Sequence, residues 1–400
     1  MEGRELHVRV PAVIMRGGTS KGVFFHERDL PADPVERDKF ILAAYGSPDP
    51  DRRQIDGLGG ATSTTSKVAI IGDGSAYGVD VTYEFGQVSI DQPLVDRRGN
   101  CGNISSAVGP FAVDERLVTP TDPITQVRFL NLNTGKKIVA HVPTTGGVFD
   151  PIGDFAIPGV PGTGSRIRLD YLDPGGAVTG RLLPTGNVRD ALDVPGLGTI
   201  EVSLVDAANP LVFVRWRDLG LDGSEKPESI DADPSLLRRI EAVRAAASVL
   251  AGIAATVDEA SRDAPSVPKL AFVGPPRAYV RSDGGTVAAN EMTLRASAMS
   301  MGRVHRSYAL TGAICTAVAA AIPGTVVAEA SSTDNGITRI GHPAGVMDME
   351  AHPRLVDGVW TIDAVAGYRT ARRLMEGWAL VPDQMLVGPV AEPVKVAGAA

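Results

Sequence analysis

A cysteine stands where a glycine-rich loop is predicted to meet a helix. The segment Arg98-Gly99-Asn100-Cys101-Gly102-Asn103 precedes a run of small and apolar residues from Ile104 to Val113. The N-terminus of a helix favours a thiolate and presents free N–H groups to an anion, and the flanking glycines let a ligand approach the backbone closely. The pattern indicates a reactive thiol beside an anion-binding loop. The alternative is an inert core cysteine, because cysteine is among the most buried residue types.

A lysine occupies a second position that could do chemistry. Lys67 follows the hydroxyl-rich run Thr62–Ser66 and precedes the apolar stretch Val68–Ile71. A lysine that enters a buried strand is partly desolvated, which favours the neutral amine and allows it to act as a base. The alternative is an edge-strand lysine that faces water. The amine is therefore a candidate general base.

The composition limits the other classes of chemistry. The chain has two cysteines, no CxxC pair and six histidines without metal-ligand spacing, so neither a disulfide framework nor a metal site is predicted. Cys315 lies inside an apolar helical pattern and is expected to be structural. A net charge of −8 and the lack of a basic run oppose nucleic-acid binding. The polar start without an apolar h-region indicates a cytoplasmic protein with reduced thiols.

Three segments resemble familiar motifs, but each fails in its sequence or in its predicted context. Gly18-Thr19-Ser20-Lys21-Gly22 matches the hydrolase pattern GxSxG, but the apolar residues that follow continue as a strand and not as the required helix. Gly135-Lys136-Lys137 lacks the Ser or Thr of a phosphate-binding loop. Gly57-Leu58-Gly59-Gly60 is not a dinucleotide fingerprint. Hydrolase and nucleotide-binding functions therefore have no support.

Similar features recur at an offset of about 200 residues, which indicates a tandem repeat. Asp33-Pro34 and Asp233-Pro234 each open a predicted helix. Lys67 and Lys269 each begin a predicted strand. Cys101-Gly102 and Met301-Gly302 each precede a predicted central helix, the second of which reaches about Ala321.

The repeat and the length predict two strand-rich domains. Their expected ranges are residues 1–190 and 191–370, with 187–198 as the linker and 371–400 as a C-terminal segment that could return to the first domain. The predicted strands cover 8–15, 22–26, 67–71, 77–85, 126–130, 137–142, 199–205 and 211–216. The apolar stretch Tyr308–Ala328 is interpreted as a core helix running into a turn, because Gly312, Pro323 and Gly324 interrupt it.

The combination of motifs resembles the PrpF family from about residue 8 to residue 350. The resemblance rests on Met15–Gly22, Asp56–Gly60, Ser63–Ile70, Gly99–Asn103, Ile322–Thr325 and Gly341–Gly345. It implies an α+β, diaminopimelate-epimerase-like fold, in which two pseudo-symmetric domains each wrap a curved, mostly antiparallel sheet around a central helix. It also implies a site between the domains, no cofactor, and Lys67 and Cys101 as the catalytic pair.

The resemblance further implies 1,3-proton shifts on unsaturated di- or tricarboxylates. Lys67 is expected to remove the proton and Cys101 to donate one. The expected substrate-binding residues are Arg16, Gly17, Gly18, Thr19, Ser20, Ser66, Gly102, Asn103, Lys269, Met301 and His342. Developing charge would be met by N–H groups at Gly102-Asn103 and at the Gly17-Gly18 turn. Because Met301 stands where epimerases of this fold carry a second cysteine, a two-thiol racemisation is not expected.

Thr311–Ala317 looks more like the 4-oxalomesaconate tautomerase branch than the methylaconitate branch, so tautomerase activity is predicted first. The alternatives are 2-methylaconitate cis-trans isomerase and aconitate Δ-isomerase. A different class, a non-catalytic carboxylate-binding accessory protein, would show no proton exchange. An enzyme using pyridoxal phosphate on Lys67 would need a phosphate cup, and none is found in the sequence. A small polycarboxylate is the expected partner, and the sequence leaves a homodimer open.

Overall fold

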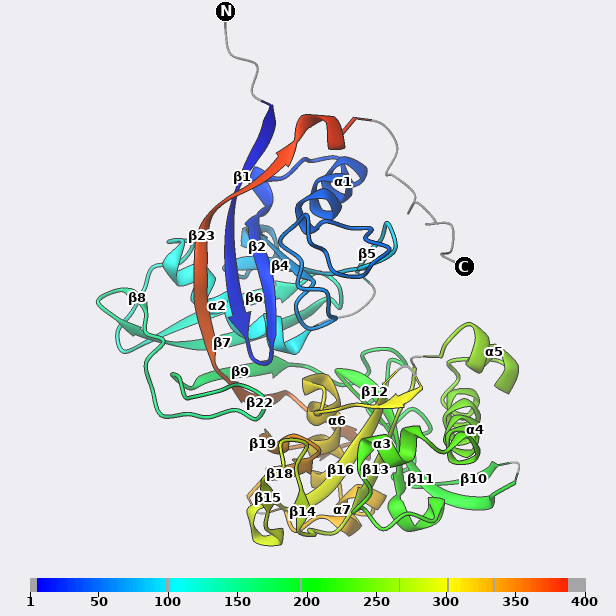
Figure 1. Ribbon diagram of the computed structural model, residues 1–400. Coiled ribbons are helices and arrows are strands. Elements are labelled where there is room, and N and C mark those ends of the chain that lie inside the picture. Colours follow the sequence, from blue (N-terminus) through cyan, green and yellow to red (C-terminus); the bar gives the residue numbers. More distant parts are fainter. Residues whose placement is uncertain are drawn as a thin grey trace, which may run out of the picture. The chain divides into compact units, whose positions relative to one another are not determined.

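The protein folds into two compact units (Figure 1). The computed structural model describes residues 6–97, 101–194, 196–265, 267–300, 302–333 and 335–387. The first unit runs up to Leu169 and takes in the chain again from Arg369, and the second unit is Asp170–Tyr368. The second unit therefore begins earlier than the predicted residue 191, and the C-terminal segment is part of the first unit.

The first unit is built on one mixed sheet. Its strands are β1 (His7–Gly17), β2 (Ser20–His26), β3 (Lys67–Asp73), β4 (Val81–Val88), β5 (Val95–Asp96), β6 (Ile124–Asn131), β7 (Lys136–Thr145), β8 (Val148–Phe149) and β23 (Ala371–Pro382). The main order is β23-β1-β2-β3-β4-β6-β7. The pairs β2/β3 and β4/β6 are parallel and the others are antiparallel. β23 runs beside almost the whole of β1, which is how the C-terminal segment joins this unit (Figure 1).

Helix α2 (Gly102–Asp114) is the core of the first unit. It contacts β1, β2, β4, β6 and β7, so the sheet wraps around it. Ile104 to Val113 are all buried, which explains why this helix consists of small and apolar residues. The predicted central helix is therefore confirmed.

The opposite face of the sheet is covered by α1 (Pro34–Tyr45). Phe24 of β2 packs on Phe111 of α2, with ring centres 5.5 Å apart, whereas its neighbour Phe25 packs on Phe40 of α1 at 6.0 Å. Successive strand residues point to opposite faces. The continuous apolar run in β2 thus follows from burial on both sides.

The helix starts predicted from Asp-Pro pairs are confirmed in both units. Asp33 accepts hydrogen bonds from the backbone N–H groups of Val35 and Glu36 at the start of α1. Asp233 does the same at the start of α4 (Pro234–Leu250). A side-chain oxygen at this position satisfies N–H groups that have no partner within the helix.

The second unit repeats the topology of the first. Its strands are β10 (Asp190–Val194), β11 (Gly198–Ala207), β12 (Asn209–Arg215), β13 (Lys269–Gly274), β14 (Tyr279–Val280), β15 (Thr286–Val287), β16 (Leu294–Ser300), β17 (Arg303–Val304), β18 (Ile337–His342), β19 (Gly345–Ala351), β20 (Arg354–Val356), β21 (Val359–Thr361) and β22 (Ala364–Arg369), and β9 (Ile167–Leu172) leads into the unit. In the order β11-β12-β13-β16-β18-β19 the pairs alternate antiparallel and parallel as they do along β1-β2-β3-β4-β6-β7. The predicted repeat is therefore confirmed at the level of strand pairing.

The helices of the second unit are α3 (Pro227–Asp231), α4, α5 (Val257–Arg262), α6 (Leu310–Ala321) and α7 (Val326–Ala330). The central one is α6, which contacts β11, β12, β18 and β19. The prediction that it starts directly after Met301-Gly302 is wrong. Strand β17 comes first, and the N-cap of α6 is Ala309. Met301 itself lies outside the described residues.

The predicted linker 187–198 is also wrong. Asp190–Val194 forms β10, which pairs with β11 over five residues. Leu192 and Val194 belong to the hydrophobic core of the second unit. Gly196 and Gly198 belong to the hairpin turn between β10 and β11 and do not mark a domain boundary, and Pro195 lies outside the described residues. In the described part of the chain no helix is long and apolar enough to cross a membrane, and the stretch interpreted as a core helix is α6 followed by a turn.

Glu115 joins the end of α2 to two strands. Its Oε2 lies 3.0 Å from His26 Nε2 in β2, and its Oε1 accepts from Arg373 Nη2 in β23 at 2.6 Å. Burial alone would raise the pKa of Glu115, but the hydrogen bonds from His26 and Arg373 outweigh it and hold this pKa below its usual value. The carboxylate therefore stabilises the folded state at neutral pH.

We expect Glu115→Gln to lower the free energy of unfolding by about 1–2 kcal/mol at pH 7. A depressed folded-state pKa gives stability that is present above the unfolded value of about 4.3 and is lost as the pH falls through the folded-state pKa. The difference from the wild type should thus shrink below about pH 4. Urea titrations at both pH values measure it. Glu376→Gln, which removes a more exposed partner of Arg373, is the matched control, and an equal loss in both variants would contradict this account.

Candidate active site

The β1–β2 hairpin carries the glycine-rich motif. Gly17 pairs with Ser20 at its end, and Gly18-Thr19 forms the turn. Ser20 is the first residue of strand β2 and no helix follows it. As predicted from the sequence, the serine therefore does not lie on a nucleophile elbow.

The turn is pressed against the first residues of α2. A Cβ atom on Gly17 would lie 2.3 Å from the backbone oxygen of Asn103, and one on Gly18 would lie 2.2 Å from Asn103 Oδ1. Asn103 Nδ2 also donates to Thr19 Oγ1 at 3.0 Å. The glycines are required here because the helix start and the hairpin approach each other this closely.

Cys101 is the N-cap residue of α2 and is partly exposed. Its Sγ lies 4.0 Å from the hydroxyl of Ser20, which is buried. Its carbonyl oxygen accepts from the backbone N–H and the hydroxyl of Ser105, which fixes the first turn. The thiol thus lies beside helix N–H groups that have no partner within the helix.

Lys67 begins β3 and its side chain is held in place by two neighbours. Its Nζ donates to Gln87 Oε1 at 2.7 Å and lies 5.0 Å from the centre of the Phe85 ring. Gln87 donates in turn to the carbonyl of Ser66. The buried hydroxyl of Tyr45 donates to the carbonyl of Lys67. With 8% of its surface exposed, Lys67 is a buried lysine and not an edge-strand lysine that faces water.

Strand β2 connects the thiol to the amine. Ser20 lies beside Cys101, and Gly22 is level with Lys67 in the parallel β2/β3 pair. Ser20 and Gly22 lie on the same face of β2, because they are two residues apart in a strand. A Cβ on Gly22 would lie 2.6 Å from the carbonyl oxygen of Lys67. The strand therefore brings the predicted catalytic pair to one end of the sheet, within the first unit.

Some of the predicted binding residues are committed to the scaffold. Arg16 Nη1 donates to the carbonyls of Gly18 and Thr370, and burial followed by the charge of Arg372 lowers the pKa of Arg16. The N–H of Gly18 donates to Thr370 as well, so it does not serve as an oxyanion donor. The hydroxyl of Ser66 is buried against Gln54. These groups shape the turn, whereas the first N–H groups of α2 have no hydrogen-bond partner within the helix.

Three residues near the pair were missed by the sequence analysis. Gln87 faces Lys67 across the β3/β4 pair, but it lies two residues beyond the predicted strand 77–85. Tyr45 ends α1 and gave no signal. Arg369, whose Nε donates to Asn103 Oδ1 at 3.2 Å, is far away in the sequence and could not have been connected to this loop.

Lys269 and His342 belong to the second unit, where they do not lie together. Lys269 is the first residue of β13. Gly341, next to His342, pairs with Arg295 of β16, and Arg295 pairs with Gly274 at the other end of β13. Burial lowers the pKa of Lys269, which is consistent with a functional amine. Its role in substrate binding stays a prediction. His342 is fully buried and its Nδ1 accepts from the N–H of Ala344. The structure thus describes His342 as a core residue and gives no support to a binding role.

Gly18 allows a direct test of the contact between the hairpin and α2. It has φ of +53°, and Gly135 in the β6–β7 turn has φ of +68° with open space around its Cβ position. We expect Gly18→Ala and Gly135→Ala each to lose about 1 kcal/mol of stability from the left-handed backbone. Only Gly18→Ala should also lower kcat/KM, by about tenfold or more, because the new methyl displaces Asn103. Equal activities of the two variants would show that the contact does not matter.

No group of three histidine, cysteine or acidic residues that could hold a metal ion occurs in the described part of the chain. The groups that the structure places at the site are an amine, a thiol and the backbone N–H groups at the start of α2. Such a set can take a proton from one atom and give one to another.

Comparisons with known proteins show the family of the chain. The family model described as PrpF protein matches residues 7–382. The chain belongs to the PrpF family and is an enzyme of the isomerase class.

The relatives span almost the whole chain. The 3-methylitaconate isomerase of Eubacterium barkeri is 46% identical over 383 residues, which are 95% of this chain and 99% of that protein. The 2-methyl-aconitate isomerase of Shewanella oneidensis is 41% identical, covering 94% and 97%. The 4-oxalomesaconate tautomerase of Pseudomonas putida is 39% identical, covering 95% and 98%.

Solved structures support the fold. A crystal structure of methylitaconate-delta-isomerase superposes with a TM-score of 0.87 at 46% identity, over 96% of this chain and 98% of that one. A hydroxyproline epimerase from Agrobacterium vitis reaches a TM-score of 0.50 at 14% identity, over 94% and 93%. The protein thus has the diaminopimelate-epimerase-like fold that the sequence predicted.

Proposed function

We propose that this isomerase moves the double bond of an unsaturated di- or tricarboxylate by transferring a proton between two allylic carbons. The observation that carries the proposal is the placement of Cys101 at the start of α2 and of Lys67 at the start of β3, both next to β2. The names of the relatives support the substrate class, since they act on methylitaconate, methylaconitate and oxalomesaconate.

The proposed reaction has two proton transfers and no redox step. Lys67 Nζ takes a proton from a carbon activated by a neighbouring carboxylate or keto group, and the electrons of that C–H bond form a dienolate. Cys101 Sγ gives its proton to the far allylic carbon, so that the double bond moves by one position. The Lys67 ammonium then returns its proton to the thiolate through solvent, which restores the resting enzyme.

The negative charge of the dienolate needs stabilisation. The first N–H groups of α2, at Gly102 and Asn103, have no partner within the helix and lie beside Cys101. Donors that are fixed before the reaction stabilise such charge strongly, since they do not have to reorganise. Asn103 is itself fixed by Thr19 and Arg369, so the helix start is rigidly placed.

For the substrate, we propose a branched dicarboxylate of the methylitaconate type, with 4-oxalomesaconate and 2-methylaconitate as the alternatives. From the sequence, oxalomesaconate was predicted first on the basis of Thr311–Ala317. In the structure Gly312 to Ala317 are all buried inside α6, so these residues reflect core packing and carry little information about a substrate. The identities, 46% against 41% and 39%, favour methylitaconate.

A substrate panel tests the proposal. Purified protein is given 3-methylitaconate, 2-methylaconitate, trans-aconitate and 4-oxalomesaconate separately, and proton NMR follows double-bond migration. We expect one of them to be converted at least tenfold faster, by kcat/KM, than the others, because each missing or extra group in a pocket costs about tenfold or more. Conversion of none of the four would overturn the proposed activity.

A further inference from the structure

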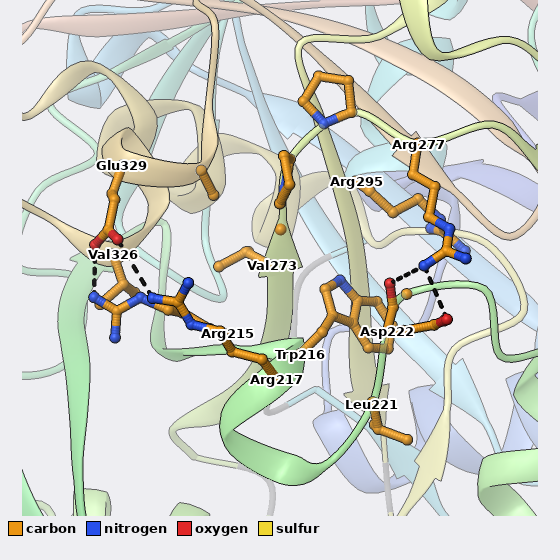
Figure 2. Close-up of a pocket in the computed structure, with 15 residues that line it drawn as sticks. Arg215, Trp216, Arg217, Leu221, Asp222, Val273, Arg277, Arg295, Val326 and Glu329 are labelled. Atoms are coloured by element: carbon orange, nitrogen blue, oxygen red, sulfur yellow. Dashed lines mark hydrogen bonds and ion pairs between the residues drawn. The ribbon is translucent and has the colours of Figure 1, made fainter.

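A cavity of about 580 Å³ lies in the second unit, away from its predicted substrate-binding lysine (Figure 2). It is lined by residues at the end of β13, among them Val273 and Gly274, whereas Lys269 is the first residue of that strand. Five residues of strand span about 16 Å. Pockets of about 300–1,000 Å³ are typical of small-molecule sites, and none of the residues that line this one belongs to the catalytic pair or the β1–β2 hairpin.

Arginines dominate the charged lining of the cavity. Four of them line it, Arg215, Arg217, Arg277 and Arg295, against the two carboxylates Asp222 and Glu329. Arg277 pairs with Asp222 at 2.9 Å, and Arg215 and Arg217 share Glu329 at 2.6 and 3.5 Å (Figure 2). Arg215 also pairs with Glu201 and Asp218 at 3.0 and 3.4 Å, so the charge that could attract an anion to the cavity comes chiefly from Arg295.

Arg295 forms no ion pair with an acidic residue in the described part of the chain, although the charge of Glu225 acts on it. Only 3% of its surface is exposed, and its Nη1 donates to the carbonyls of Ala296 and Gly341. Its Nε has no hydrogen-bond partner, and the guanidinium stacks 4.1 Å from the centre of the Tyr279 ring. Burial lowers the pKa of Arg295 to about 10, so the side chain stays charged at neutral pH. A buried charge of this kind requires a counter-ion.

Trp216 adds a second donor of the same kind. It is 4% exposed and its Nε1–H has no acceptor. Its indole is held against Gly274 and Gly223, where added Cβ atoms would lie 2.8 and 3.4 Å away. The guanidinium carbon of Arg295 lies 5.9 Å from the centre of the Trp216 ring. Unpaired buried donors are rare in folded proteins and call for an explanation.

We propose that this cavity binds a small organic anion, whose carboxylate accepts hydrogen bonds from Arg295 and Trp216. A carboxylate has two acceptor oxygens and can serve two donors at once. The apolar part of the ligand contacts Leu221, Val273 and Pro276, which also line the cavity. The chemical class is an aryl or branched alkyl carboxylate, because the cavity combines cationic donors with apolar walls.

Isothermal titration calorimetry tests the proposal with 3-phenylpropionate as the probe and 3-phenylpropanol as its uncharged analogue. We expect saturable binding of one 3-phenylpropionate per chain, and binding of the alcohol at least tenfold weaker, since an anion makes the stronger hydrogen bonds. Binding should persist in Lys67→Met, which separates this cavity from the proposed substrate site. No saturable binding, equal affinity for the alcohol, or loss of binding in Lys67→Met would overturn the proposal.

Variants of the cavity complete the test. Arg295→Met should abolish binding, and Ala330→Glu, which adds a carboxylate to the wall, should weaken it about tenfold or more. Trp216→Phe keeps a ring in place and removes only the N–H donor, so it keeps the proposal testable if Arg295→Met fails to fold. Arg262→Gln removes an exposed arginine outside the cavity and should bind like the wild type. Wild-type affinity in both Ala330→Glu and Trp216→Phe would contradict the proposal.

Discussion

Replacement of Lys67 by methionine is expected to lower kcat by about a thousandfold, within the range that general acid–base groups contribute. Methionine fills nearly the same volume beside Phe85, so the buried contacts of β3 are kept and only the amine is lost. The melting temperature should change by no more than a few degrees. Steady-state kinetics with the substrate found in the panel, together with thermal unfolding, measure both quantities.

Two further variants make this result specific. Lys137→Met removes an exposed lysine of β7 whose Nζ donates to the carbonyl of Tyr77, and it should leave kcat unchanged. Lys67→Arg keeps the positive charge but has no usable neutral form, and it should be nearly as inactive as Lys67→Met. High activity of Lys67→Arg would mean that the residue acts as a fixed charge and does not transfer a proton.

Cys101→Ser should lower kcat by about a hundredfold to a thousandfold. Serine has the same shape and can keep the contact with Ser20, but its hydroxyl gives up a proton far less readily than a thiol. The matched control is Cys315→Ala. Cys315 is fully buried, its Sγ lies 3.1 Å from the carbonyl of Val205, and burial raises the pKa of this thiol well above its usual value.

The two cysteines can also be compared in the unmodified protein. N-ethylmaleimide reacts with thiolates that solvent can reach, so it should label Cys101 and inactivate the enzyme while Cys315 stays unlabelled. Mass spectrometry of the labelled peptides reports both. Full activity after complete labelling of Cys101 would show that this thiol takes no part in the reaction.

The repeat made most of the fold predictable from the sequence. Asp-Pro pairs at residues 33 and 233 and lysines at 67 and 269 mark elements whose local signals are strong, and the structure has helices and strands at these positions. The start of the second central helix was not predictable in this way. β17 is inserted between Met301 and α6, and a matching dipeptide does not reveal an insertion that follows it.

The candidate site was predictable only in part. Cys101, Gly17 and Asn103 were found because a helix start and a close backbone approach leave a mark on the local sequence. The committed hydrogen bonds of Arg16 and Ser66, and the contact of Arg369 with Asn103, depend on residues brought together by tertiary folding. Periodicity and spacing carry no information about such contacts.

The central claim is that Lys67 and Cys101 each exchange a proton with one end of the allylic system. Proton NMR in D₂O measures this directly, by following deuterium uptake at both allylic carbons of the accepted substrate in the wild type, Lys67→Met and Cys101→Ser. The account predicts uptake at both carbons in the wild type, loss of exchange at the deprotonated carbon in Lys67→Met, and residual exchange at that same carbon in Cys101→Ser. Wild-type exchange at both carbons in either variant would contradict it.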